Sequence, residues 1–483
     1  MHYKLIIKTI AALQLVIAFF HLICAGVAFH YDETEALRGF IFSISLLVGF
    51  GVFFLILYRN TKPEGVSTKD GFVLVTLSWL AASLGGSLPF YISGAIPSYT
   101  DAFFETISGF STTGASILTN IEALPMSILF WRSLSHWLGG MGIVVLAVAI
   151  LPLLGIGGMQ LIKAEAPGPS VDKITPRITE TAKYLWYIYV LFTVLQTALL
   201  MLGGMNLFDA LTHTFGTVAT GGFSTKNTSV AHFDSAYIDW VVTIFMVLAG
   251  VNFVLHFKLL TGRLKSIVIN SELKAYLAII FLATLFVAYT LHGNVYTNAA
   301  DSFRYAAFQV ASFTTTTGYA TADYEQWPYF AQIILFMLMF VGGCAGSTGG
   351  GIKVIRIVTL LKQGINEMKY LVHPRGIFVI KLSGHTVKKD IVYAVSGFFF
   401  LYIFLVLTVT MIVATSGSDI STSFTTALAT VGNIGPGFGM VGPTENYAFF
   451  PAYVKWVLSA AMIIGRLEIY TILVLFTPMF WKK

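Results

Sequence analysis

Long apolar runs separated by short polar segments dominate the sequence. Each run holds roughly the 20 residues that a helix needs to cross the hydrocarbon core of a bilayer. The ten runs cover residues 5–29, 39–58, 72–90, 129–154, 184–201, 237–260, 275–291, 333–361, 392–415 and 453–479. This pattern predicts ten membrane spans. The first is expected to be retained, because it is longer than a signal core and has no small-residue cleavage site.

Composition supports a polytopic membrane protein. Hydrophobic residues make up 56% of the 483 residues and charged residues 11%, whereas soluble domains carry about 25% charged residues. The two cysteines, Cys24 and Cys344, both lie in apolar stretches. Neither a disulfide framework nor a thiolate metal site is therefore indicated.

The positive charges alternate with the predicted spans. Of the 29 Lys and Arg residues, 23 lie near the two termini or in the segments expected on one side of the membrane. The positive-inside rule then places both termini in the cytoplasm, and the net charge of +6 requires no nucleic-acid partner. The inner segments 155–183 and 362–390 are basic but too short for a nucleotide-binding domain. Inner-leaflet lipid is one partner that fits their charge.

One pattern recurs four times between spans. The copies are DAFFETISGFSTTGAS from Asp101, DALTHTFGTVATGGFS from Asp209, DSFRYAAFQVASFTTTTGYA from Asp301 and DISTSFTTALATVGNIGPG from Asp419. Each copy reaches a glycine after small or hydroxyl residues, and these glycines are Gly114, Gly221, Gly318 and Gly432. Such a segment is too short to cross the bilayer, which indicates a re-entrant half-helix. Its Asp is expected to be the N-cap.

The residues around each glycine predict a cation-coordinating stretch. Half-helices of this orientation point their partially negative C-terminal ends into the membrane. Extended backbone carbonyls can replace the water shell of a dehydrated cation, and glycine accepts the backbone angles of a sharp turn. A single copy fits helix packing through small residues equally well. Four copies in the same frame favour an ion path.

With four helix–pore loop–helix repeats, the chain resembles the Trk/Ktr/HKT superfamily of potassium transport proteins. Two extra N-terminal spans and the motifs SHWLGGMG, GGCAGSTGGGIK and GRLEIYTILVLF make it similar to the bacterial TrkH branch. The resemblance covers essentially the whole chain and implies an all-α polytopic membrane fold with pseudo-fourfold symmetry around one pore. The expected units are residues 1–69, with two N-terminal transmembrane helices, and pore repeats at 70–160, 161–265, 266–365 and 366–483.

By this resemblance, a selectivity filter for potassium maps onto four short stretches. They are Ser111, Thr112, Thr113 and Gly114; Val218, Ala219, Thr220 and Gly221; Thr315, Thr316, Thr317 and Gly318; and Thr430, Val431 and Gly432. Potassium is expected as the permeant ligand, since Gly114 stands where Ser accompanies sodium permeation in related plant proteins. The fourth stretch, TVGNIGPG, departs most from the others and leaves its register open.

A gate is expected below the filter. As one helix, residues 327–361 would measure about 50 Å, more than the bilayer core of about 30 Å. Glycine fills six of the ten positions 342–351, which disfavours helix. We expect a mobile intramembrane loop that obstructs the pore, as the resemblance supports, with a packing kink as the alternative. The loop residues expected at the gate are Gly343, Gly346, Ser347, Thr348, Gly349 and Gly350.

Arg466 lies midway along the last apolar run. Such a charge costs about 2.5 to 3.5 kcal/mol at that depth. We expect Arg466 to face the cavity and meet the glycine-rich loop, where its charge slows cations until the loop moves. Structural pairing with another helix is the alternative.

The expected function is passive, gated potassium uptake. The alternative is a secondary transporter that couples potassium to protons or sodium, which requires a titratable or coordinating group at mid-membrane. Glu105 and Glu468 are the candidates for that role. Nucleophile-elbow and zinc-helix spacings are both missing, and His213 is expected to be a packing residue. Neither catalysis nor an organic cofactor is expected.

The resemblance implies an assembly as well. It suggests a homodimer in the bacterial inner membrane, with a cytosolic ring of TrkA-type nucleotide-binding subunits docked on the basic inner segments. Nucleotide would then bind to the partner and not to this chain.

Overall fold

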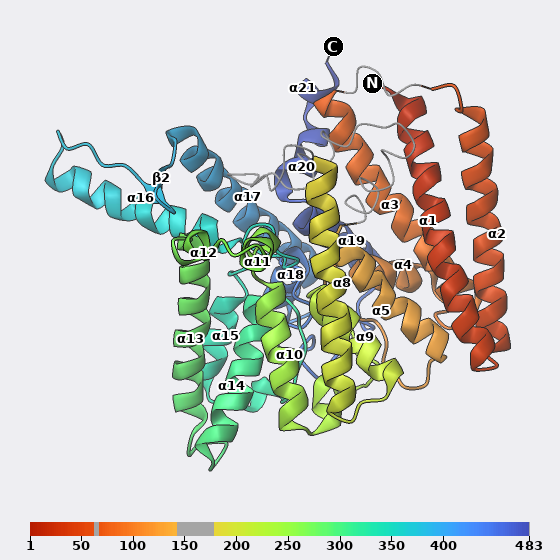
Figure 1. Ribbon diagram of the computed structural model, residues 1–483, viewed down its shortest axis with the longest axis horizontal. Helices are drawn as coiled ribbons and strands as arrows, with labels where there is room; N and C mark the ends of the chain where they lie inside the picture. The colour runs from red at the N-terminus through yellow and green to blue at the C-terminus, as the bar shows by residue number, and fades with distance from the viewer. Residues whose placement is uncertain (62–66, 143–177, 483) are drawn as a thin grey trace.

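The computed structural model describes residues 1–61, 67–142 and 178–482 (Figure 1). Six helices in these ranges are long and apolar enough to cross a membrane. They are α1 (Tyr3–His30), α2 (Thr34–Leu57), α3 (Thr68–Ile92), α8 (Ile178–Leu202), α13 (Ser271–Leu291) and α17 (Lys389–Ala414). Both chain ends lie at the same end of the bundle, at the top of Figure 1.

Two expected spans are bent sharply. Helices α10 (Ala236–Ala249) and α11 (Phe253–Leu260) meet at 98°, and α19 (Ala452–Arg466) meets the segment Ile469–Phe476 at 115°. The predicted spans 237–260 and 453–479 are therefore each made of two helical parts. Asn252 starts a new helix by accepting from the Val254 amide, and Glu468 has a left-handed backbone, with φ of 58°, just before α20 (Ile469–Leu473).

Two further expected spans are also interrupted or only partly described. The run at 333–361 is broken as predicted, into α15 (Tyr329–Leu338) and α16 (Val354–Val372). The run at 129–154 begins in α5 (Met126–Gly140), and its part beyond residue 142 lies outside the described residues. So do the expected repeat boundary at 160/161 and most of the inner segment 155–183.

Four short helices lie buried inside the bundle. They are α4 (Tyr99–Phe110), α9 (Leu207–Val218), α14 (Ala299–Thr314) and α18 (Ile420–Val431). Each packs against the long helix that precedes it, in the pairs α3 with α4, α8 with α9, α13 with α14 and α17 with α18. We call them the pore helices, and we call α5, α10, α15 and α19 the inner helices.

Each inner helix also packs against the pore helix of the next repeat. Helix α5 contacts α9, α10 contacts α14, and α19 contacts α4. Between the third and fourth repeats, the ring of Phe336 on α15 lies 6.0 Å from that of Phe424 on α18. The repeats are thus joined in a closed order, first to second to third to fourth to first.

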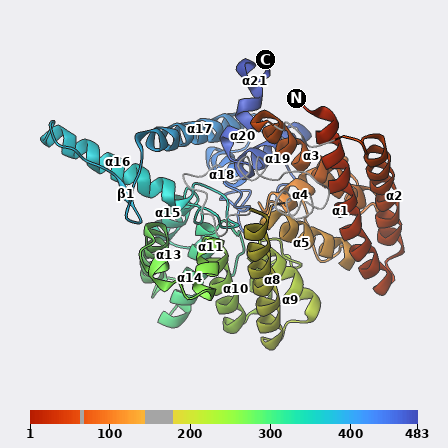
Figure 2. The same ribbon diagram turned by 45° about the horizontal axis from the view of Figure 1, so that its top comes forward.

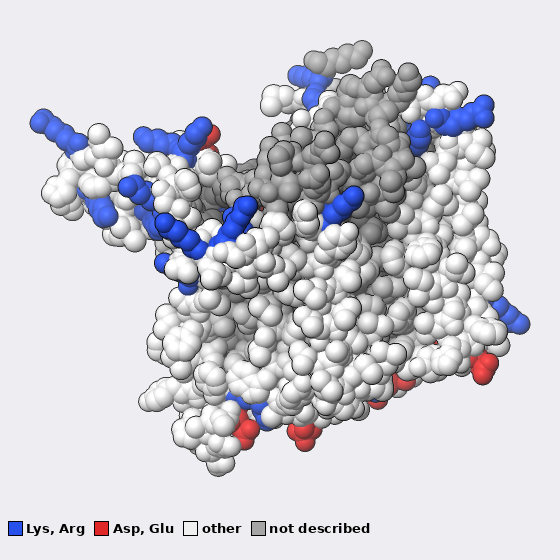
Figure 3. Space-filling view, viewed as in Figure 1, with Lys and Arg blue, Asp and Glu red and all other residues white. Residues whose placement is uncertain are grey.

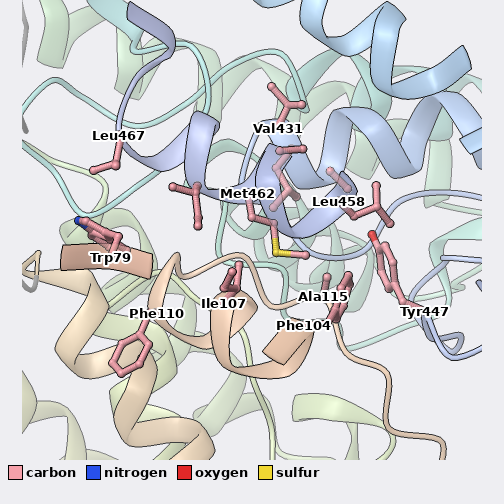
Figure 4. Close-up of a cluster of buried hydrophobic side chains, with 14 of the residues drawn as sticks. Trp79, Phe104, Ile107, Phe110, Ala115, Val431, Tyr447, Leu458, Met462 and Leu467 are labelled. Atoms are coloured by element: carbon pink, nitrogen blue, oxygen red, sulfur yellow. The ribbon is translucent and has the colours of Figure 1, made fainter. Parts of the chain in front are cut away.

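The first and fourth repeats share a buried apolar cluster (Figure 4). Trp79 of α3, Ile107 of α4, Val431 of α18 and Met462 of α19 all belong to it. This packing joins segments that are more than 300 residues apart in sequence, and it holds the C-terminal repeat against the N-terminal one.

Helices α1 and α2 lie side by side against the first repeat (Figure 1). The Gln14 amide donates to the Ala81 carbonyl at 2.7 Å, and the Glu33 carboxylate accepts from the Ser127 amide at the start of α5 at 3.0 Å. The two extra N-terminal helices are therefore bound to the bundle by polar contacts as well as by apolar packing.

The remaining described elements are short. They are η2 (Ser229–Phe233), α12 (Leu264–Val268), η3 (Tyr324–Gln326), β1 (Lys381–Leu382), β2 (His385–Thr386), η4 (Val474–Phe476) and α21 (Pro478–Trp481). Strands β1 and β2 pair antiparallel. Together with α16 they extend away from the body of the bundle (Figures 1 and 2).

Charged side chains on the visible face separate by end. Most Lys and Arg lie at the end that holds both termini, and Asp and Glu gather at the opposite end (Figure 3). A broad uncharged band lies between them, as expected of a surface that contacts hydrocarbon.

Candidate ion path

The pore helices begin with capped turns, but three of the four predicted N-caps are wrong. Asp419 is the N-cap of α18 and accepts from the Thr422 amide at 3.3 Å. The other three pore helices are capped by residues that precede the predicted ones: Ser98, Asn206 and Asn298. Asp101, Asp209 and Asp301 lie three residues later, in the first turn. Ser or Asn followed by an acid at this distance is close to the capping-box spacing, a signal present in the sequence.

All four pore helices end in the same motif. The residue after each C-cap has a left-handed backbone, with φ between 53° and 58°. These residues are Thr112, Thr220, Thr316 and Asn433. The next amide bonds back to the carbonyl five residues earlier, as from Thr113 to Ser108 at 2.9 Å, which is the bond of a Schellman motif. Threonine rarely adopts this conformation, so its recurrence indicates that the surrounding structure enforces it.

Two residues further on, each segment contains a glycine with φ between 80° and 94°. Glycine is required here by close approach as well as by φ. A Cβ added at Gly114 would lie 2.2 Å from the carbonyl oxygen of Gly221, and a Cβ at Gly222 would lie 2.0 Å from the oxygen of Thr317. A Cβ at Gly318 would lie 2.2 Å from the oxygen of Ile434. A Cβ at Gly435 would lie 2.5 Å from the oxygen of Thr113. Each segment therefore touches the next, and the fourth touches the first, which closes a ring.

We call the four stretches in this ring, residues 111–114, 219–222, 315–318 and 432–435, the filter segments, because they lie where the sequence predicts a filter. The first and third agree with the expected stretches. In the second, the glycine at positive φ is Gly222 and not Gly221, and in the fourth it is Gly435 and not Gly432. Val218, Thr430 and Val431 belong to the last turns of their pore helices. The expected register is thus wrong by one residue in the second repeat and by three in the fourth.

Hydroxyl groups in the filter segments bond to one another. Ser111 Oγ lies 2.7 Å from Thr113 Oγ1, and the matching pair in the third repeat, Thr315 and Thr317, is also 2.7 Å apart. In the fourth segment, Asn433 Nδ2 donates to Thr113 Oγ1 at 2.9 Å and so links the two ends of the ring. The first two contacts brace single segments, and the third joins the fourth segment to the first.

One carbonyl oxygen in each filter segment accepts no hydrogen bond from the described residues. Within the described residues, no hydrogen bond is made to the carbonyl oxygens of Thr113, Gly221, Thr317 or Ile434. Backbone polar groups inside a membrane protein must be satisfied by protein, water or an ion. Carbonyls gathered from four segments form the kind of oxygen ring that coordinates a dehydrated monovalent cation.

The glycine-rich loop, residues 342–351, lies against the C-terminal ends of the pore helices. The Gly350 amide donates to Thr316 Oγ1 at 2.7 Å, and Thr348 Oγ1 donates to the Val218 carbonyl at 3.1 Å. A Cβ at Gly349 would lie 3.0 Å from the Thr315 oxygen. A Cβ at Gly350 would lie 2.5 Å from the Gly432 oxygen, so the loop touches the third and fourth filter segments.

The other predicted gate residues bond within the loop or to neighbouring helices. Gly343 accepts from the Val354 amide at 3.2 Å, and Gly346 accepts from the Phe253 amide at 3.0 Å. The Ser347 amide closes a turn onto the Cys344 carbonyl at 3.1 Å. These contacts tie the loop to the bends of its neighbouring helices.

Arg466 bridges three elements at the end of α19. Its Nη1 donates to the Thr348 carbonyl at 2.7 Å, and its Nη2 donates to the carbonyls of Gly139 at 2.7 Å and Gly140 at 3.1 Å. The guanidinium thus joins the glycine-rich loop to the C-terminal end of α5.

The two carboxylates considered for ion coupling both pair with arginine. Glu105 is buried, and its Oε1 accepts from Arg132 Nε at 2.6 Å. Arg132 also donates to the Ser224 carbonyl at 2.8 Å, just beyond the second filter segment. Glu468 pairs with Arg356 of α16. Sequence reasoning missed both arginine partners, because they lie 27 and 112 residues away.

His213 lies within α9 and is a packing residue, as expected. Its ring nitrogens contact the Asp209 carbonyl and Ser224 Oγ, each at 2.8 Å. The described residues contain no cluster of three or more His, Cys, Asp or Glu side chains that could hold a metal ion.

An open pocket of about 920 Å³ lies near the N-terminus of α18, and Glu325, Asp419 and Glu445 are among its lining residues. Burial raises the pKa of the Glu325 carboxyl, and nearby Asp323 and Glu445 add to that effect, while the Gly439 amide opposes it. Glu325 therefore takes up a proton at a higher pH than an ordinary exposed glutamate.

Comparison with known proteins identifies relatives along the full length of the chain. The Trk system potassium uptake protein TrkH of Escherichia coli K12 is 43% identical over 490 residues and covers 100% of both chains. The TrkH protein of Halomonas elongata is 44% identical over 92% of each chain. The crystal structure of the potassium transporter TrkH from Vibrio parahaemolyticus superposes with a TM-score of 0.88 at 39% identity, over 100% of both chains.

A family model described as TrkH, cation transport protein, matches residues 39–483. Together with a pore-helix ring that closes on four glycines, these matches show that the chain belongs to the TrkH family.

Proposed function

We propose that this protein takes up potassium through a transmembrane pore whose narrowest part is the ring of filter segments. The observation that carries the proposal is a set of four carbonyls that accept no hydrogen bond from the described part of the chain, those of Thr113, Gly221, Thr317 and Ile434, in a closed ring at the ends of four pore helices. The partially negative helix ends favour a cation there. The relatives are potassium uptake proteins by name, and potassium is the permeant ligand that we assign to this ring.

The glycine-rich loop and Arg466 form the proposed gate. The loop contacts Thr316 and Val218 on the filter side, and Arg466 holds Thr348 from below. A guanidinium in the cavity repels a cation that leaves the filter. Opening therefore requires the Arg466 contact to break and the loop to move.

Coupled transport with protons or sodium is the alternative. The two carboxylates considered for coupling, Glu105 and Glu468, are held by Arg132 and Arg356. Each acid is thus engaged in an ion pair within the protein and is not open to a transported ion. This favours passive conduction.

The proposed setting is the bacterial inner membrane, with both termini in the cytoplasm. The distribution of Lys and Arg at the end that holds both termini supports this orientation (Figure 3). We further propose that the chain acts as a homodimer, without catalysis or an organic cofactor of its own. A TrkA-type nucleotide-binding ring would dock on the basic cytosolic segments, which also contact membrane lipid.

Flux through the purified chain in liposomes tests the proposal. Potassium should move down its gradient, and the reversal potential should follow the potassium gradient alone. A fixed offset that changes with the pH or sodium gradient would establish coupled transport instead. No potassium movement, with and without the nucleotide-binding partner, would overturn the proposal.

A further inference from the structure

Helix α16 begins without a cap of its own. Its N-cap residue, Lys353, supplies no side-chain acceptor, although the first amides of a helix need partners. The missing acceptor comes from another helix, because Glu272 Oε1 of α13 accepts from the Ile355 amide at 3.1 Å. Glu272 is 7% exposed. It therefore provides a buried carboxylate at a helix N-terminus, where negative charge is favourable.

The same oxygen atom reaches into the glycine-rich loop. Glu272 Oε1 accepts from the Ala345 amide at 2.8 Å. Ala345 and Ile355 lie on either side of Thr348 and Gly350, the loop residues that touch the pore helices. One side-chain atom thus fixes both flanks of the obstructing part of the loop.

Glu272 is in turn next to a cytosolic contact. The Ser271 amide donates to Ser383 Oγ at 3.0 Å, and the Ser383 amide donates to Ser271 Oγ at 2.8 Å. Ser383 is the first residue of the two-residue turn of the β1–β2 hairpin, with φ of 49°. The hairpin also contacts α16, since Lys362 Nζ donates to the Lys381 carbonyl at 2.7 Å.

We propose that Glu272 is the positioning residue that holds the glycine-rich loop in place, and that the β1–β2 hairpin acts on the loop through the Ser271–Ser383 pair. A displacement of the hairpin moves the first turn of α13 and withdraws the Glu272 acceptor from Ala345 and Ile355. The inference rests on the proposed function only in naming the loop as a gate. The contacts themselves are independent of what the pore conducts.

Cys344 provides a native reporter for the loop. It is fully buried, next to Ala345, and its amide bonds to the Gly250 carbonyl at 2.8 Å. Its labelling by a water-soluble thiol reagent requires local opening of the loop. Replacing Cys24, the other cysteine of the chain, with alanine leaves Cys344 as the single target.

The test measures the labelling rate of Cys344 in this background after substitution of Glu272. Glu272→Gln keeps an oxygen at the same reach without the charge, whereas Glu272→Asp keeps the charge and shortens the side chain. Because Glu272 accepts from backbone amides, we expect the length of its side chain to affect the labelling rate more than its charge. We expect Glu272→Asp and Glu272→Ala to raise the rate by about tenfold or more, the effect of losing the two hydrogen bonds to Ala345 and Ile355, and Glu272→Gln, which can still accept both, to change it by less than about threefold.

Glu367→Ala is the matched control, because Glu367 is an exposed acid on α16 and should leave the rate unchanged. Ser383→Ala tests the hairpin and should raise the rate by an intermediate factor. If Glu272→Ala does not yield monodisperse protein, the labelling rates of Glu272→Asp and Glu272→Gln are compared with each other and are sufficient for the test.

Wild-type labelling rates in both Glu272→Ala and Glu272→Asp would overturn the clamp. A wild-type labelling rate of Cys344 in Glu272→Asp together with a raised rate in Glu272→Gln would also overturn the clamp. That result would favour charge pairing of Glu272 with Lys353 and Arg356. A wild-type rate in Ser383→Ala would remove the hairpin from the proposal. Potassium flux in the same liposomes separates the two claims: a wild-type chain that conducts no potassium contradicts the proposed function, while the labelling order still decides the clamp.

Discussion

Arg466 donates a hydrogen bond of 2.7 Å to the carbonyl oxygen of Thr348. This contact joins the end of the last inner helix to the glycine-rich loop, whose other side touches the pore helices. A single cationic side chain therefore contacts the loop and places positive charge beside the proposed cation path.

Replacing Arg466 with alanine should increase potassium flux. Loss of a charge-assisted hydrogen bond changes a local equilibrium by about tenfold or more, and removal of the charge lowers the barrier for a cation. Flux of the purified chain in liposomes is the measurement. Arg38→Ala, at an exposed position on α2, is the control. Unchanged flux and unchanged regulation in Arg466→Ala would assign Arg466 to a structural role.

The filter register predicts different outcomes for two glycines of the fourth repeat. Gly435→Ala should reduce potassium flux by about tenfold or more, because the new Cβ would overpack against the Thr113 oxygen at a position with φ of 94°. Gly432→Ala should have a milder effect, since Gly432 is a C-cap with φ of −81°. Unidirectional potassium flux distinguishes them. The reverse order of severity would restore the register expected from the sequence.

The buried Glu105–Arg132 pair predicts non-additive stability. Removing one partner strands a charge, and breaking such a pair costs about 3 to 5 kcal/mol. Glu105→Leu and Arg132→Met should each lower the midpoint of thermal unfolding, and the double variant should lie above the worse of the two. Additive losses would mean that the two side chains act independently.

External pH should affect flux through Glu325. Its carboxyl has a raised pKa and lies in a pocket with two other acids. Below that pKa the carboxyl is neutral, which removes negative charge that attracts cations. Potassium flux should therefore fall as external pH is lowered, beginning above the pH at which an exposed glutamate, with a pKa of about 4.3, titrates.

Glu325→Gln should remove this pH step and leave flux near the low-pH value, whereas Glu35→Gln, at an exposed position on α2, should retain it. An unaltered pH profile in Glu325→Gln would show that this pocket does not influence conduction.

Apolar runs and the fourfold recurrence of Asp followed by small residues and glycine were sufficient to predict four short buried helices, and the turning glycine in the first and third copies. The break of the span at 333–361 also followed from its glycine content. These are local properties, because helix length and glycine propensity depend on residues close in sequence. Register and capping were predicted less well. The second repeat offers two adjacent glycines, and only the approach of Thr317 to Gly222 selects one of them.

The sequence by itself therefore determined the membrane class and the four short buried helices between the long ones, because hydrophobic length and backbone permissiveness are encoded locally. Tertiary structure decided which glycine of each repeat lies in the ring, which arginine neutralises Glu105, and which carboxylate caps α16. Those choices depend on atoms brought together from positions up to hundreds of residues apart, and a buried amide or charge accepts whichever partner the packing places within hydrogen-bond distance.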